Sequence, residues 1–152
     1  MTKPPAYDEI IEMAIKNEQE AHDLYAGMAQ KAEAPTAKAH FEQLAKMELG
    51  HKKRLEKLDS AFFESYELKR PTDLKIVDYL VDVELHPGSS YQDTLLFAAK
   101  REKAAYNLYT DLAAVYASNP EVSKIFQVLA EEEAYHKLAM EREDDDKGYM
   151  ED

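Results

Sequence analysis

Apolar residues recur in four stretches of the chain at alternating intervals of three and four residues. This spacing places them on one face of an α-helix, where they form a seam that packs against other helices. In the second stretch the seam consists of Phe41, Leu44, Glu48, His51, Leu55 and Leu58. Glu48 and His51 stand one turn apart at positions where a core needs Leu or Ile, so this helix carries polar groups on its buried face.

The other three stretches have the same spacing, and each also has polar residues on its buried face. The seam of the first helix, which we expect to end at about Lys31, is Ile11, Ala14, Glu18, Ala21, Tyr25 and Met28. The seam of the third helix is Leu95, Ala98, Glu102, Ala105, Tyr109 and Leu112. The seam of the fourth helix is Val122, Phe126, Leu129, Glu133, His136 and Met140. Each predicted helix therefore carries at least one ionisable residue on its core-facing side.

Turn and capping residues set the expected boundaries of these helices. Pro35 and Thr36 separate the first two, with Thr36 as the expected N-cap of a second helix that ends near Phe63. Ser89 or Ser90 caps a third helix from about Tyr91 to Ala117, and Asn119 followed by Pro120 begins the fourth.

The long connection between the helix pairs runs from about residue 64 to residue 89, and its middle, DLKIVDYLV, is expected to form a short helix. Short loops within each pair and one long crossover between pairs predict an all-α four-helix bundle over residues 1–143. Residues 144–152 form an acidic tail that we expect to be flexible.

The two halves of the chain repeat one another. A shift of 84 residues aligns Glu18 with Glu102 and Tyr25 with Tyr109. A shift of 85 residues aligns the sequence FEQLAKMELGHK with FQVLAEEEAYHK, so that both Glu-x-x-His pairs match. The one-residue difference falls in the loops. We therefore expect a duplicated helical hairpin that brings both sets of polar residues to one level of the bundle.

Composition and charge narrow the classes of function. The 152-residue chain is 45% hydrophobic and 33% charged, which is typical of a helical domain with its own core. Its net charge of −12 argues against nucleic-acid and anionic-membrane partners. It has no cysteine, which excludes disulfides, thiolate catalysis and cysteine-ligated metal within these residues. No signal peptide or membrane-spanning segment is apparent, so we expect a cytoplasmic protein.

The repeated Glu and His residues at buried seam positions predict a metal site. An uncompensated carboxylate in a bundle core costs several kcal/mol, whereas a metal ion accepts carboxylate oxygen and imidazole nitrogen as ligands. The candidate ligands, through which any catalysis would proceed, are Glu18, Glu48, His51, Glu102, Glu133 and His136. Four carboxylates and two imidazoles suit two ions about 3.5–4 Å apart. In this scheme Glu48 and Glu133 bridge the ions, and the other four residues bind one ion each.

Tyr25 and Tyr109 lie two turns beyond Glu18 and Glu102 on the same seams, where we expect their phenols to donate hydrogen bonds to ligand carboxylates.

A single Glu-x-x-His motif in a chain this rich in Glu more often faces solvent. Because the motif is duplicated at matching seam positions, solvent exposure explains the two copies poorly. His22 corresponds to Tyr106 in the repeat, which favours a place at the flank of the bundle. Zinc prefers four-coordinate nitrogen and sulfur sites, so the donor set favours iron or manganese.

At these positions the sequence resembles the ferritin-like di-iron carboxylate superfamily, and within it the rubrerythrin family. The resemblance covers about residues 6–143. It implies a ferritin-like four-helix bundle with two iron ions, with manganese or zinc as alternatives. Rubrerythrins also carry a rubredoxin domain with four cysteines, so the resemblance implies a separate electron-donor protein here. Their additional Glu, one turn after the third-helix ligand, is replaced by Ala105, so the ligand set is closer to that of a bacterioferritin-type ferroxidase centre.

Three hypotheses follow from the residues and the resemblance together. The first is a di-iron oxidoreductase that reduces hydrogen peroxide or dioxygen in oxidative-stress defence. The second is a ferroxidase or iron-binding protein for storage or buffering. The third is a helical bundle that binds metal only for stability. We also expect a homodimer, although one sequence leaves open whether the halves pair within a chain or between two.

Overall fold

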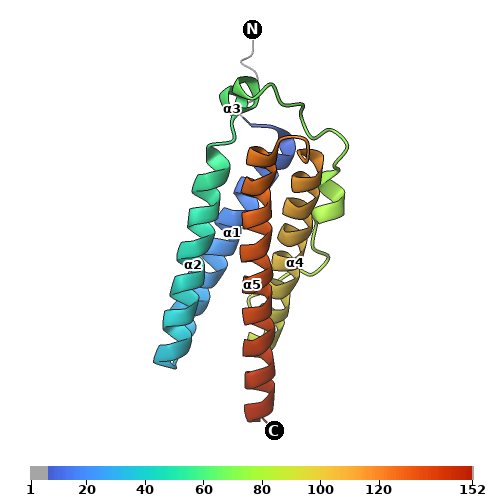
Figure 1. Ribbon diagram of the computed structural model, residues 1–152. Helices are drawn as coiled ribbons and strands as arrows, with labels where there is room; N and C mark the ends of the chain where they lie inside the picture. Colours follow the sequence, from blue (N-terminus) through green and yellow to red (C-terminus); the bar gives the residue numbers. More distant parts are fainter. Residues whose placement is uncertain (1–6, 152) are drawn as a thin grey trace. The chain divides into compact units, whose positions relative to one another are not determined.

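The computed structural model describes the backbone of residues 7–151 and the side chains of residues 7–142. Within that range the chain is helical and contains no β-strand (Figure 1). Its elements are α1 (Glu9–Lys31), α2 (Pro35–Glu56), α3 (Ser60–Ser65), a 3-10 turn η1 (Ile76–Tyr79), α4 (Tyr91–Val115) and α5 (Pro120–Glu151). The predicted all-α class is confirmed. None of the helices in the described range is both long and apolar enough to cross a membrane.

The chain divides into two compact units, unit 1 (Met1–Ile76) and unit 2 (Val77–Asp152). Unit 1 is built on the hairpin of α1 and α2, and unit 2 on the hairpin of α4 and α5. In each unit a short loop joins the two long helices, which lie side by side in opposite directions (Figure 1). The predicted pair of repeated helical hairpins is therefore confirmed.

The four predicted seams are the buried faces of the four long helices. Every seam residue is buried except Ala105, which is half-buried. Large side chains fill the levels on both sides of the polar positions, with Leu44 and Leu55 in unit 1 and Leu129 and Met140 in unit 2. Burying an apolar side chain of this size stabilises a fold by about 1.5–3 kcal/mol. These apolar layers therefore supply the stability that allows polar residues between them.

Several helix ends follow the predicted caps. Ser90 Oγ accepts a hydrogen bond from the backbone N–H of Asp93 at 3.0 Å, which makes Ser90 the N-cap of α4. Asn119 Oδ1 accepts one from the N–H of Val122 at 3.2 Å, and Pro120 is the first residue of α5. Each cap satisfies a backbone donor that a helix leaves without a partner inside its first turn.

The prediction that Thr36 caps the second helix is wrong. The helix begins at Pro35, two residues before the start that a Thr36 cap would give, and its N-cap Ala34 makes no side-chain capping bond. Proline suits the first helical position because its ring fixes φ near the helical value and its missing N–H would have no partner there. Thr36 consequently lies inside the first turn and is exposed.

The prediction that the second helix continues to about Phe63 is also wrong. The helix ends at Glu56, and a separate short helix, α3, begins at Ser60. Asp59 causes the restart, because its Oδ1 accepts a hydrogen bond from the N–H of Phe62 at 3.0 Å. An Asp side chain competes well for such free amide groups, so it favours the start of a new helix over the interior of an old one.

The expected helix in the long connection is reduced to the single 3-10 turn η1. Its residue Tyr79 is buried, and the phenol donates a hydrogen bond to Asp111 Oδ2 on α4 at 2.6 Å. Burial and this bond to a carboxylate raise the pKa of the Tyr79 hydroxyl, so the phenol stays protonated as a donor. One buried side chain therefore anchors this end of the connection within unit 2.

The end of α4 also differs from expectation. Helix α4 ends at Val115 rather than at about Ala117, and α5 continues to Glu151. The acidic tail at residues 144–152 lies outside the residues whose side chains are described. Its expected flexibility stays a prediction.

Replacement of the α5 cap tests the capping assignments. We expect Asn119→Ala to lower the free energy of unfolding by about 1 kcal/mol, because the N–H of Val122 loses its partner. Thr36→Ala is the matched control and should change the free energy by less than about 0.5 kcal/mol, because Thr36 is exposed and caps nothing. Urea unfolding followed by circular dichroism measures both. Equal losses in the two variants would contradict the assignment of Asn119 as the cap.

Candidate metal centre

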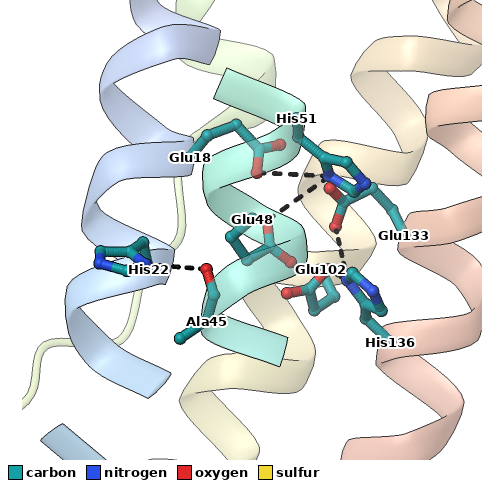
Figure 2. A network of polar contacts seen from close by, with 8 residues as sticks. All are labelled: Glu18, His22, Ala45, Glu48, His51, Glu102, Glu133 and His136. Atoms are coloured by element: carbon teal, nitrogen blue, oxygen red, sulfur yellow. Dashed lines mark hydrogen bonds and ion pairs between the residues drawn. The ribbon is translucent and has the colours of Figure 1, made fainter. Parts of the chain in front are cut away.

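Unit 1 brings three of the predicted ligands together in a buried group, which we call triad 1: Glu18, Glu48 and His51. Glu18 comes from α1 and the other two from α2, where a spacing of three residues places them on one face. His51 Nδ1 lies 3.5 Å from Glu18 Oε2 and 3.6 Å from Glu48 Oε2 (Figure 2). One ligand atom from each residue lies within 4.8 Å of the others. This is the separation at which three side chains can share one metal ion.

Unit 2 contains the matching triad 2: Glu102, Glu133 and His136. Glu102 comes from α4 and the other two from α5. His136 Nδ1 lies 3.7 Å from Glu102 Oε2 and 3.9 Å from Glu133 Oε2 (Figure 2). A ligand atom from each of these residues again lies within 4.8 Å of the others. The repeat in the sequence is therefore a repeat of local geometry as well.

All six side chains are withdrawn from solvent. Their exposed fractions are 2% or less, and those of the two histidines are 0%. Each triad places two carboxylates and one imidazole among apolar side chains, where charges are poorly solvated. Protonation of one carboxylate would still leave the negative charge of the other without compensation. A bound cation is therefore the simplest way to stabilise the group.

The chemistry of the donor set fits a transition metal. Carboxylate oxygens suit harder cations such as Mn²⁺, and imidazole nitrogen suits iron, copper and zinc. In both triads the Nδ1 atom of the histidine faces the carboxylates, which leaves Nδ1 as the ring nitrogen placed to bind the same ion. The residues of each unit can therefore hold metal.

The two predicted supporting tyrosines are among the largest fully buried side chains. Tyr25 is 0% exposed and Tyr109 is 1% exposed, and both lie on the seams that carry Glu18 and Glu102. Burial of a phenol requires a hydrogen-bond partner for its O–H group. Their hydrogen bonding to ligand carboxylates stays a prediction.

His22 lies at the flank of triad 1, as the repeat indicated. Its half-buried ring places Nδ1 2.8 Å from the backbone oxygen of Ala45 on α2 (Figure 2). A second polar contact between the same helices was not anticipated: Lys52 Nζ donates to Gln19 Oε1 at 2.7 Å. Sequence patterns could not find this pair, because it depends on how far α1 is shifted along α2.

Comparison with known proteins gives the family. No curated protein sequence matches the chain. The family model described as Rubrerythrin matches residues 9–84 and 93–149, which together include nearly all of both hairpins and all six residues of the triads. The match extends over most of the chain, in agreement with the helical fold and the buried carboxylate and histidine groups. The chain belongs to the rubrerythrin family.

Proposed function

We propose that this protein is a di-iron oxidoreductase that reduces hydrogen peroxide or dioxygen, and that its two triads supply the ligands of the iron. The observation that carries the proposal is the occurrence of two buried triads of the same composition at equivalent positions of a repeat. Family membership supports it independently. A metal site with two equivalent halves is the arrangement that a duplicated hairpin produces most directly.

Charge balance favours a pair of divalent ions. The four glutamates carry four negative charges when ionised, and two ferrous ions carry four positive charges, while the imidazoles bind in the neutral form. In the proposed arrangement Glu48 and Glu133 would be ligands shared by the two ions. Glu18 and Glu102 would each bind one ion, as would each histidine. The assembled site would be neutral overall, which is the state that a buried location favours.

The side chains of the chain itself have three roles in this proposal. The carboxylates would hold the ions and could change their mode of binding as charge changes. Tyr25 and Tyr109 would orient the carboxylates by donating hydrogen bonds, and the apolar seam residues would exclude bulk water. When bound, the iron pair would supply electrons for reduction of the oxidant. Because the chain has no cysteine-ligated redox centre, we propose a separate electron-donor protein to return those electrons.

The alternative function is ferroxidation, with iron as the substrate that is oxidised for storage or buffering. The observation in its favour is Ala105, which stands where the resemblance leads us to expect an additional carboxylate. The net charge of −12 is also compatible with a protein that attracts cations. Manganese is the alternative metal to iron.

Replacement of a bridging residue tests the metal assignment. We expect the unaltered protein to bind two ferrous ions per complete site and Glu48→Ala or Glu133→Ala to lose the pair, because each removes a ligand shared by both ions. Iron is measured by a chelator assay after anaerobic loading and desalting. Glu42→Ala and Glu131→Ala replace exposed glutamates on the same helices and should leave the stoichiometry unchanged. Retained iron in the first two variants would contradict the proposal.

The choice of oxidant distinguishes the two functions. We expect protein loaded with ferrous iron to be oxidised when mixed with hydrogen peroxide or dioxygen, with absorbance appearing in the oxo-bridged diferric region. Faster oxidation by peroxide would support peroxide reduction, and faster oxidation by dioxygen would support an oxidase or ferroxidase. A protein that retains iron but is oxidised by neither would leave only a structural role for the metal.

The state of assembly also separates these functions. We expect a homodimer, with a mass in light scattering of twice the 17.4 kDa of one chain. A cage of many chains would favour iron storage instead.

Mixing a variant that lacks the ligands of triad 1 with a variant that lacks those of triad 2 tests whether the halves pair within one chain or between two chains. Recovery of iron binding only in the mixture would mean that halves from two chains form a site.

The buried charges should lower the free energy of unfolding of the metal-free protein relative to a variant with apolar residues at the same positions. We expect the triple variant Glu102→Leu, Glu133→Leu and His136→Leu to unfold at higher urea concentration in the absence of metal. The gain should be roughly 1–4 kcal/mol, because well-packed apolar residues replace a buried ionic group. The same variant should lose most of the stabilisation that metal gives the unaltered protein. A metal-free variant less stable than the original would show that the buried triad itself contributes stability.

A further inference from the structure

The His22 ring joins α1 to α2 beside triad 1. Its Nδ1 lies 2.8 Å from the backbone oxygen of Ala45, and a carbonyl oxygen can only accept a hydrogen bond. In this contact Nδ1 must therefore carry the hydrogen, although a free neutral histidine can carry it on either ring nitrogen. His22 is one turn beyond Glu18 on α1, and Ala45 is three residues before Glu48 on α2 (Figure 2). The bond thus spans the two helices next to the residues they contribute to the triad.

A second link between the same helices lies immediately beside the ligands. Gln19 follows Glu18 in the sequence, Lys52 follows His51, and Lys52 Nζ donates to Gln19 Oε1 at 2.7 Å. The amide nitrogen of Gln19 in turn donates to Asp23 Oδ1 at 3.0 Å. The two links resist sliding of α1 along α2, which would separate Glu18 from the ligands on α2.

Unit 2 has the same ligands but different residues at the supporting positions. The repeat places Lys103 at the position of Gln19 and Lys137 at that of Lys52, and two cations cannot form the corresponding hydrogen bond. Lys137 Nζ is instead 2.7 Å from Glu141 Oε1 on its own helix. Tyr106 occupies the position of His22 and is 39% exposed. The repeat is therefore symmetric in its ligands and asymmetric in the groups that hold them.

We propose that the two triads are inequivalent, and that His22 is a positioning residue that makes triad 1 the tighter site for the first metal ion. The inference rests on the proposed function in that both triads bind metal. Distances from histidine to glutamate are similar in the two units, so the difference lies in how firmly the ligands are held. A preorganised ligand set binds more tightly because less conformational freedom is lost on binding.

Two variants of the full-length chain isolate the triads. Glu102→Gln with His136→Gln leaves triad 1 intact, and Glu18→Gln with His51→Gln leaves triad 2 intact. Co²⁺ is the probe, because its d–d absorption reports both binding and coordination number, and competition with a chelator gives Kd. We expect the Kd for triad 1 to be roughly 10- to 100-fold lower than that for triad 2, the range typical of groups that orient metal ligands. Equal values, or the reverse order, would overturn the proposal.

Substitutions at His22 then test its role directly. In the triad 1 background, His22→Gln should raise the Kd for Co²⁺ by about 10-fold or more, because Gln cannot place a donor where Nδ1 lies. His22→Asn keeps a donor near that position and should recover most of the affinity. In the triad 2 background, His22→Gln should leave Kd unchanged, as should the matched control Tyr106→Phe.

These measurements separate the inference from the function on which it rests. If the unaltered protein bound no Co²⁺ and no ferrous iron, the proposed function would fail. If it bound two ions but His22→Gln left the Kd of triad 1 unchanged, only the role of His22 would fail. A rise in Kd in both backgrounds, or failure of Asn to restore binding, would show general destabilisation and would also overturn the positioning role. Circular dichroism of each variant establishes that it is folded.

Discussion

The burial of carboxylates inside apolar helix seams is the constraint on which the rest of this structure depends. Four glutamates and two histidines are almost completely withdrawn from solvent, at positions where the helical repeat calls for aliphatic residues. Such groups destabilise a core unless they are paired, neutralised or bound to metal. The layers of Phe, Leu and Tyr on either side of them must therefore stabilise each hairpin strongly enough to fold it around an unfavourable centre.

This constraint also explains the form of the motif. Ligands three residues apart on one helix lie on the same face, so α2 and α5 can each present a carboxylate and an imidazole together. The partner helices α1 and α4 need to add only one glutamate. Each hairpin is then a complete local unit, in which a short loop brings the two helices together and their register places the third ligand. Duplication of the hairpin supplies the second set of ligands in the same local arrangement.

The parts of this arrangement that follow from periodicity were predictable. Seam residues, the two hairpins and the candidate ligands all depend on intervals of three and four residues, which the sequence displays directly. The ends of helices were less predictable, because they depend on competition between neighbouring caps. Pro35 began α2 before Thr36 could cap it, and Asp59 started α3 where the apolar pattern continued across the break. The contacts of His22 and Lys52 were not predictable, since they require the relative shift of two helices.

The inequivalence of the triads bears on how the carboxylates would respond to a change of charge. A ligand can move between binding modes only if its helix and its neighbours permit the movement, and in unit 1 the His22 and Lys52 bonds oppose it. In unit 2 the residue one turn beyond Glu102 is Ala105, a small and half-buried side chain that offers no alternative oxygen ligand. Any adjustment of the ligands there must be made by Glu102 itself. If both triads bind metal as proposed, triad 1 would hold its ion more rigidly, and the flexibility needed for redox chemistry would come from triad 2.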